Sequence, residues 1–272
     1  MKNIVCVKIN CYKGFSKQET LTGIKNAGFN YVELSTSKGN SLNLSQDMSL
    51  DEINQFKQEL DDLGLIPIAI GGNSYLMDDD TSKIIKNIEI GHILGVKYID
   101  TTVFNARNDA GLKTTEEDII MHINNYIPYL EKCNLDLVLE LHGDYARGEI
   151  LLPILKKVNN KHIHINYDTG NALYCGKLKP EEMLKDFENC IDYVSFMHLK
   201  DKLDEIDVWN FPAIGSGYIP FKEVFNIMQE HNNNSTLTVE IEFTDKGVQN
   251  VEEVNKALVD SANYLKSIGM EL

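Results

Sequence analysis

The sequence predicts an α/β protein, a single (β/α)8 TIM barrel that spans residues 1–272. Three observations lead to this fold class. Short β-rich runs alternate with longer helical patterns along the whole chain, which is typical of proteins with a parallel sheet. Eight such units follow one another at intervals of roughly 30 residues, as in a closed barrel. No linker, low-complexity run or shift in composition divides the chain, so one domain is expected.

The strands are predicted from eight short runs that are rich in β-branched and aromatic residues. In chain order they cover residues 4–9, 31–34, 66–70, 97–104, 135–141, 162–168, 193–199 and 237–243. Because helices separate them, these strands are expected to lie parallel in one sheet. No Gly-x-Gly-x-x-Gly motif opens the first helix, which weakens the alternative of an open dinucleotide-binding sheet.

Eight helical segments fill the intervals between the strands, among them residues 51–64, 81–95, 114–133, 179–190, 219–231 and 251–269. In the first of these, Ile53, Phe56 and Leu60 fall on one stripe, and Gly64 is placed to end the helix. Pro180 lies near the start of its helix, where its missing N–H does no harm.

Composition and charge narrow the range of functions. The chain carries 26 Lys and Arg against 41 Asp and Glu, a formal net charge of −15. A field this negative repels phosphate backbones, so no nucleic-acid partner is expected. No apolar run reaches the roughly 18 residues that span a bilayer, and the start shows no cleavable signal, so no membrane partner is expected. Five irregularly spaced cysteines are interpreted as reduced thiols of a cytoplasmic protein.

Polar residues stand at matching positions near the carboxyl ends of the last four predicted strands, where a barrel carries its active site. Glu140 is the first charge near the end of the fifth strand, and Asp168 stands just before the turn after the sixth. His198 and Glu240 each lie between two apolar residues of the seventh and eighth strands. Since successive side chains alternate between the two faces of a strand, these four are expected to point inward.

Glu140, Asp168, His198 and Glu240 are therefore predicted to bind one divalent metal ion. Three carboxylates and one imidazole form a mainly oxygen site, which favours Mn²⁺ and also suits Mg²⁺, Co²⁺ or Zn²⁺. Without a cation, the gathered carboxylates would repel one another by several kcal/mol in a partly buried mouth.

Five motifs resemble those of the xylose isomerase-like TIM barrels: ELHG (140–143), DTGNAL (168–173), HLKD (198–201), GSG (215–217) and VEIE (239–242). That family includes sugar phosphate isomerases and epimerases, inosose isomerases and dehydratases, and apurinic-site endonucleases. The resemblance covers essentially the whole chain in element order. It implies that Glu140, Asp168, His198 and Glu240 hold the metal.

The resemblance also implies an isomerase or epimerase of a small keto-sugar, sugar phosphate or polyol ketone. The metal in such a site polarises the carbonyl and stabilises the enediolate that forms when the neighbouring proton leaves. Glu140 and Glu240 would then act as general base and general acid. The alternatives are a metal-dependent dehydratase of the inosose or dehydroshikimate type, and a sugar-binding barrel without catalysis.

Residues beside the four ligands are candidates for binding the substrate. His142 shares the inward parity of Glu140, and Lys200 shares that of His198, although a salt bridge is an equal alternative for Lys200. Glu242 has the parity of Glu240 and is the alternative ligand, but the family pattern favours Glu240.

Three further residues complete the predicted substrate-binding set. Glu33 lies inward near the end of the second strand, where it fits a polar contact at the mouth. Trp209 is the single tryptophan, and in the loop 201–218 it would either stack on a sugar face or anchor the loop. Asn171 stands where many ketose epimerases and inosose isomerases carry a substrate-binding histidine. Ala146 replaces a sugar-binding glutamate of the ketose 3-epimerases, so both departures argue against those particular activities.

The endonuclease branch of the family is not expected here. Its additional zinc ligands are histidines, and the corresponding stretches AIGGNSYLM (69–77), YIDTTVFNA (98–106) and WNFPAIGSG (209–217) contain none. The net charge of −15 also argues against an endonuclease, because it repels the phosphate backbone of a nucleic acid. The sequence does not reveal the substrate, and it leaves open a homodimer or a homotetramer, both of which are common in the family.

Overall fold

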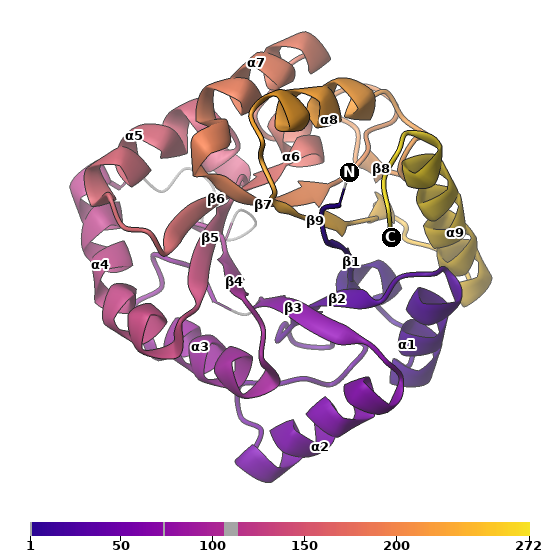
Figure 1. Cartoon of the computed structure of the whole chain (residues 1–272), viewed down its shortest axis with the longest axis horizontal. Coiled ribbons are helices and arrows are strands. Elements are labelled where there is room, and N and C mark those ends of the chain that lie inside the picture. Colours follow the sequence, from indigo (N-terminus) through magenta and orange to yellow (C-terminus); the bar gives the residue numbers. More distant parts are fainter. Residues whose placement is uncertain (1, 73, 106–113) are drawn as a thin grey trace.

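The computed structural model describes residues 2–72, 74–105 and 114–272. Eight parallel strands close into a barrel in the order β1-β2-β3-β4-β5-β6-β7-β9, and the last pairs with the first (Figure 1). The predicted (β/α)8 TIM barrel is therefore confirmed. The strands are β1 (Val5–Lys8), β2 (Tyr31–Ser35), β3 (Ile66–Gly71), β4 (Tyr98–Thr101), β5 (Asp136–Glu140), β6 (Ile163–Asp168), β7 (Val194–Leu199) and β9 (Thr236–Val239).

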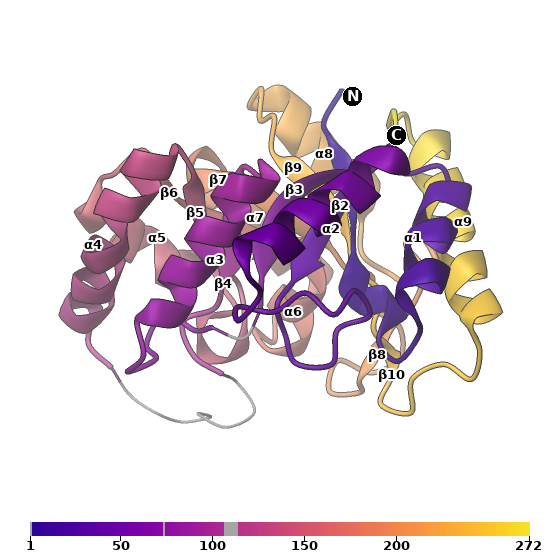
Figure 2. The same ribbon diagram turned by 90° about the horizontal axis from the view of Figure 1, so that it is seen from below.

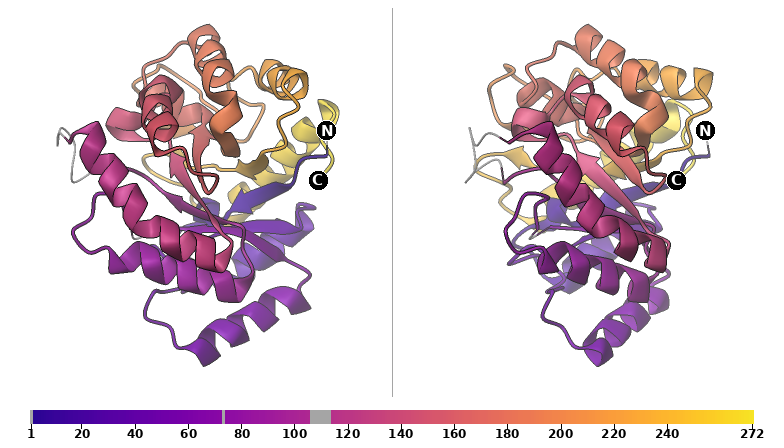
Figure 3. Two further views of the ribbon diagram at one scale, coloured as in Figure 1. Left: turned by 60° about the vertical axis from the view of Figure 1, so that its left-hand side comes forward. Right: turned by 90° about the vertical axis from the view of Figure 1, so that its left-hand side faces the viewer.

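Helices surround the barrel, as the two views in Figure 3 show. They are α1 (Lys17–Asn26), α2 (Leu50–Asp62), α3 (Ser82–Leu94), α4 (Glu116–Cys133), α5 (Gly148–Val158), α6 (Thr169–Tyr174), α7 (Pro180–Cys190), α8 (Phe221–Glu230) and α9 (Val251–Ser267). α1, α2 and α4 each begin with a capping box, which satisfies backbone N–H groups of the first turn. Among the helices of the described ranges, none is long and apolar enough to cross a membrane.

The eighth barrel strand is shorter than the predicted run 237–243. β9 ends at Val239, and the chain then leaves the barrel. It forms β10 (Phe243–Thr244), which pairs antiparallel with β8 (Asn210–Phe211) in the loop after β7. The run 237–243 thus contains β-forming residues of both the barrel strand and the small sheet. Composition alone therefore does not mark where the barrel strand ends.

The fourth strand is also shorter than predicted. Of the run 97–104, only Tyr98–Thr101 is a strand. Within the described residues, strand pairing continues beyond Thr101 as an isolated bridge between Thr102 and Tyr75. This bridge lies in the segments that follow β3 and β4, so the extra β-forming residues belong to the loops at the barrel mouth.

An apolar layer fills the barrel interior beneath the site. It consists of the inward side chains Cys6, Ala69, Tyr98, Val138 and Phe196, with the Tyr98 and Phe196 ring centroids 5.0 Å apart. Side chains two residues further along a strand point to the same face, one layer nearer its carboxyl end. On four of these strands that next residue is polar: Lys8, Asp100, Glu140 and His198. This packed apolar layer therefore closes the barrel directly below a ring of charged side chains.

The carboxyl ends of the strands open on one side of the molecule. In the side view of Figure 2, the loops that follow the strands gather at the lower edge together with β8, β10 and α6. The two chain termini lie at the opposite edge. The loops that vary most between barrels of this kind therefore surround the ring of charged groups.

Candidate active site

A cavity of about 500 Å³ lies at the carboxyl ends of the barrel strands. Its charged lining includes Lys8, Glu33, Asp100, Glu140, Lys200 and Glu240. These residues come from both halves of the chain, and closure of the barrel between β1 and β9 brings them to one place. The cavity is therefore the position where this fold places an active site.

The four predicted metal ligands meet beside this cavity. Glu140 ends β5, Asp168 ends β6 and His198 is the last residue but one of β7. The β6–β7 register sets Asp168 directly opposite His198, while Glu240 follows the last residue of β9. Each of the four is buried, and each offers a ligand atom within 4.8 Å of the other three.

This group of four fits a divalent cation. Asp168 Oδ2 and Glu240 Oε2 are buried and accept no hydrogen bond from the residues that the structure describes. They lie 3.6 and 3.3 Å from His198 Nδ1. The Lys200 ammonium lies 3.8 Å from Asp168 Oδ2 and 3.5 Å from Glu240 Oε2, so it pairs with both oxygens without a close hydrogen bond. Buried carboxylate oxygens without a hydrogen bond are costly, and a cation between them would reduce that cost. The donor set of three carboxylates and one imidazole is one that Mn²⁺, Mg²⁺, Co²⁺ and Zn²⁺ accept.

The two nitrogens of His198 have different surroundings. Nδ1 faces the other three ligands, and Nε2 lies 3.1 Å from Glu33 Oε2. An Nε2–H that donates to Glu33 leaves the Nδ1 lone pair free for a metal. Burial and Lys8 each lower the pKa of His198, but the surrounding carboxylates outweigh both and raise that pKa well above its usual value.

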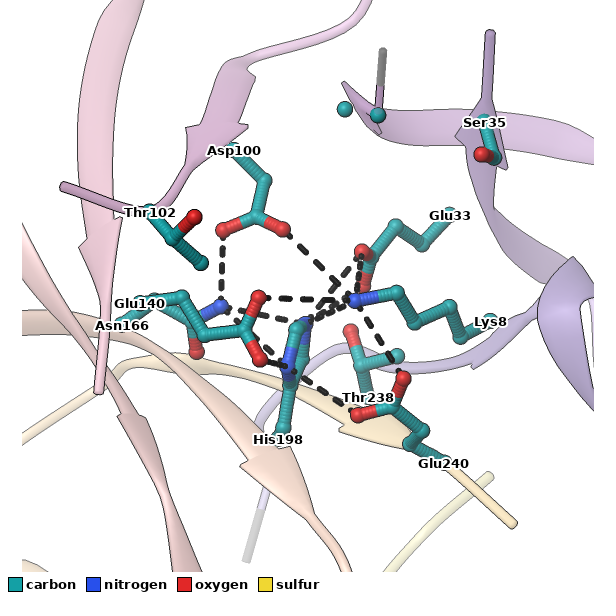
Figure 4. A network of polar contacts seen from close by, with 12 residues as sticks. Lys8, Glu33, Ser35, Asp100, Thr102, Glu140, Asn166, His198, Thr238 and Glu240 are labelled. Carbon is teal, nitrogen blue, oxygen red and sulfur yellow. Dashed lines mark hydrogen bonds and ion pairs between the residues drawn. The ribbon is translucent and has the colours of Figure 1, made fainter. Parts of the chain in front are cut away.

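Lys8 is absent from the predicted site but lies at its centre (Figure 4). Burial lowers the pKa of Lys8, and the surrounding carboxylates outweigh this and raise it well above its usual value. The sequence does carry a signal, because Lys8 is the one charged residue in the run 4–9. Its Nζ lies 3.2 Å from Glu33, 3.3 Å from His198, 3.4 Å from Glu240, 3.6 Å from Asp100 and 3.9 Å from Glu140.

Asp100 on β4 is the second residue that the sequence prediction missed. Its Oδ1 accepts a hydrogen bond of 2.9 Å from Asn166 Nδ2, and its Oδ2 faces Lys8. Burial raises the pKa of Asp100 to about 7, although Lys8 opposes the rise. Asp100 follows Tyr98 by two residues, so it shares the inward parity of that core residue, although its neighbour Thr101 is polar and weakens the alternation.

Glu140 and Glu240 approach from opposite sides of His198 in Figure 4. Burial alone would raise the pKa of each. Lys200 and Lys8 outweigh burial at Glu240 and lower its pKa to about 2. Lys8 and His198 do the same at Glu140, whose pKa lies well below its usual value. Both side chains are therefore carboxylates at neutral pH, able to accept a proton.

His142 and Lys200, which were predicted to bind substrate, both line the cavity. His142 is half-buried, and its Nδ1 makes no hydrogen bond within the described part of the chain. Lys200 forms an ion pair with Glu242, the salt bridge expected as its alternative role. Its Nζ also lies 4.7 Å from the centre of the Phe211 ring.

The other three predicted substrate residues lie in different places. Glu33 is fully buried at the cavity floor, against His198 and Lys8. Asn171 lies behind the ligands, where its Nδ2 donates to Glu140 Oε1 at 3.2 Å. Trp209 lines a neighbouring cavity of about 470 Å³.

Of the two glutamates after β9, only Glu240 belongs to the buried group of four among the described residues. Glu242 stands at the cavity rim with a side chain that is 25% exposed, and it pairs with Lys200. Burial raises the pKa of Glu242, and Lys200 opposes this rise.

Two solved structures illustrate the similarity of the fold to known proteins. A D-psicose 3-epimerase, crystallised with D-fructose, matches with a TM-score of 0.76 at 12% identity, over 98% of this chain and 99% of that one. A protein named IolI, with a bound zinc atom, matches with a TM-score of 0.75 at 18% identity over 100% of both chains. At these identities the likeness concerns the fold.

Two comparisons rest on sequence. An inosose dehydratase of Clostridium tetani is 27% identical over 180 residues, which are 59% of this chain and 58% of that protein. The chain thus matches less than two thirds of that relative. The sequence model of the xylose isomerase-like TIM barrel family matches residues 21–268. With the closed barrel already described, this match establishes that the chain belongs to the xylose isomerase-like TIM barrel family.

Proposed function

We propose that the chain is a divalent-metal-dependent isomerase or epimerase of a small keto-sugar, sugar phosphate or polyol ketone. The observation that carries this proposal is the buried group of Glu140, Asp168, His198 and Glu240 beside a cavity of about 500 Å³. That volume falls in the range of small-molecule sites. The sugar epimerases among proteins of the same fold support the substrate class.

The same four residues would hold the metal, with Mn²⁺ as the favoured ion. When bound there, a divalent ion polarises a substrate carbonyl and stabilises the negative charge that develops after the neighbouring carbon loses its proton. Glu33 holds the His198 ring through Nε2 and so keeps Nδ1 directed at the other ligands. Asn171 holds Glu140, and its backbone N–H donates to Asp168 Oδ1 at 2.7 Å.

Glu140 and Glu240 would move the proton. Both are ionised in the metal-free protein, and they approach the space beside His198 from different strands. One carboxylate can take a proton from the carbon next to the carbonyl, and the same or the opposite carboxylate can return it. Return of the proton to the neighbouring carbon, which was the carbonyl carbon, gives an isomer, and return to the same carbon from the opposite face gives an epimer.

His142 and Lys200 would bind the substrate oxygens. The Nδ1 of His142 is buried without a hydrogen-bond partner in the described ranges, so a substrate hydroxyl would satisfy it. Lys200 offers an ammonium group at the side of the cavity near Trp209, whose ring centre lies 5.7 Å from its Nζ. Both residues line the cavity and would fix the orientation of a polyhydroxylated ligand.

Dehydration is the second candidate reaction, and one observation favours it. The relative that matches 180 residues of the chain by sequence is named an inosose dehydratase. The same proton abstraction, followed by loss of the neighbouring hydroxyl, gives this outcome. His142, which lines the same cavity, would then donate a proton to the departing hydroxyl.

Proton exchange with solvent tests the proposed function. The Mn²⁺-loaded protein is incubated with a panel of ketoses, ketose phosphates and inososes in deuterated water, and products are followed by NMR and mass spectrometry. Deuterium at the carbon beside the carbonyl supports the proposal. A product lighter by one water identifies a dehydratase.

Two variants assign the roles in that assay. Glu140→Gln and Glu240→Gln should each abolish deuterium uptake, because an amide cannot take up the proton. Glu59→Gln is the matched control, since Glu59 of α2 forms an ion pair with Lys17 of α1 away from the cavity. Uptake that persists in both site variants, or is absent from the metal-loaded protein with the whole panel, would contradict the proposal.

A further inference from the structure

The site contains a second group of side chains that could hold a cation. Glu33, Asp100 and His198 each offer a ligand atom within 4.8 Å of the other two, and all three are buried. This group lies on the Nε2 side of the His198 ring, whereas the other three proposed metal ligands face Nδ1. The imidazole thus stands between two acidic positions.

The Lys8 ammonium already lies in the second position. Its Nζ is 3.2 Å from Glu33 Oε1, 3.3 Å from His198 Nε2 and 3.6 Å from Asp100 Oδ2, so it contacts every member of that group. Figure 4 shows the side chain reaching in from β1 with its tip among these atoms. The Lys8 side chain is 9% exposed.

The fold holds Lys8 in this place. Lys8 is paired in register with Glu33 across the β1–β2 ladder, so the two side chains leave neighbouring strands at the same level. Cys6, two residues earlier, belongs to the apolar layer that closes the barrel below. The aliphatic part of Lys8 therefore rises from a packed floor. Its charged end contacts all three members of the second group and also lies 3.4 Å from Glu240 Oε1 of the first group.

We infer that Lys8 is a built-in cation that fills the second position and limits the site to one divalent ion. The inference rests on the proposed one-metal site and adds a residue that sets its metal count. A divalent ion held by Glu33 and Asp100 would need the space of the ammonium and would be repelled by its charge. Because Lys8 is covalently attached, it keeps Glu33 paired at any metal concentration, whereas an ion could dissociate.

The metal content of a Lys8→Met variant tests this inference. Met preserves the length of the side chain and removes its charge, so Glu33 and Asp100 are left without a cation. After saturation with Mn²⁺ and removal of the free ion, the wild-type protein should hold one equivalent and Lys8→Met should hold two. Electron paramagnetic resonance should show isolated Mn²⁺ in the wild type and two coupled ions in the variant.

Three further variants serve as controls. Lys8→Arg keeps the charge and should hold one equivalent. Lys97→Met removes one positive charge from the exposed amino end of β4, so it should also hold one equivalent. Adding Glu33→Gln to Lys8→Met removes a ligand of the second position and should return the content to one.

Several results would overturn the inference. One equivalent in Lys8→Met, or two in the wild type, would show that Lys8 does not set the metal count. If Lys8→Met is unstable, Mn²⁺ should restore its melting temperature with two equivalents bound, and failure of Mn²⁺ to do so also counts against the inference. A wild-type protein that binds no Mn²⁺ would instead contradict the proposed function itself, so the two failures are distinguishable.

Discussion

Replacing Glu33 with Gln removes the charge beside the imidazole of His198, a proposed metal ligand, and keeps the size of the side chain. Glu33 is 0% exposed, and its two oxygens divide between two partners. Oε2 lies 3.1 Å from His198 Nε2, and Oε1 lies 3.2 Å from Lys8 Nζ. No atom of the proposed metal-binding group is itself changed, so any effect on metal affinity must pass through these two neighbours.

The expected loss of metal affinity follows from those contacts. Removing a residue that holds a metal-binding imidazole typically weakens the metal about 10- to 100-fold, or about 1.4 to 2.8 kcal/mol. The amide oxygen of Gln can still accept from Nε2–H, so Glu33→Gln should lie near the lower end, at about tenfold. Glu33→Ala leaves no acceptor and should approach about 100-fold. In both variants Lys8 loses its nearest carboxylate and turns to Glu240, which adds to the loss.

Competition with a fluorescent chelator measures the Mn²⁺ dissociation constant of each variant, and circular dichroism checks that each is folded. Glu59→Gln, on the surface of α2, is the control and should bind Mn²⁺ like the wild type. Unchanged affinity in both Glu33→Gln and Glu33→Ala would refute the reasoning, because the His198 ring would then need no partner at Nε2.

Three other predictions concern pH, the loop after β7 and stability. The pKa of His198 is raised in the metal-free protein, so Mn²⁺ must displace a proton from this ring to bind it. The affinity of the protein for Mn²⁺ should therefore rise by up to about tenfold per pH unit between pH 6 and 8, and an affinity that does not change with pH would contradict this. Asp201 accepts hydrogen bonds from three backbone N–H groups of the loop that carries Trp209. Asp201→Asn should loosen this loop and shift the tryptophan fluorescence emission to longer wavelength, and unchanged emission would show that the loop does not depend on Asp201. Asp186 accepts hydrogen bonds from the backbone N–H groups of Gly148 and the next residue at the start of α5. Asp186→Ala should therefore lower the free energy of unfolding, measured in urea, by about 3 kcal/mol. A loss below about 1 kcal/mol would mean that water takes over the hydrogen bonds of Asp186.

The fold could be predicted because its signals are local. Each strand is marked by β-forming residues, and each helix by its apolar stripe, within one window of sequence. The group of Glu140, Asp168, His198 and Glu240 could be predicted as neighbours for a related reason. They stand at the carboxyl ends of four consecutive strands, and consecutive strands of a parallel barrel are adjacent in space.

Two features could not be predicted in this way. The early end of β9 depends on β10 pairing with β8, a contact between two loops that no periodicity records. The placement of Trp209 beside a second cavity depends on the same small sheet. Both are decided by how long loops fold over the barrel mouth, where sequence patterns carry little information.

Lys8 shows a different limit of prediction from sequence. The sequence shows that Lys8 points into the barrel, but it does not show which residues Lys8 contacts there. Whether an inward residue of β1 meets Glu240 depends on closure of the barrel and on the stagger between β1 and β9, which sets Val7 opposite Val239. That closure places six carboxylates around two lysines and one histidine: Glu33, Asp100, Glu140, Asp168, Glu240 and Glu242. Two ammonium groups and one protonated imidazole cannot balance six carboxylates, so even with Lys8 in place the site keeps a negative charge that a divalent ion would reduce. The proposed metal position lies on the Nδ1 side of His198, where the carboxylate oxygens without hydrogen bonds lie.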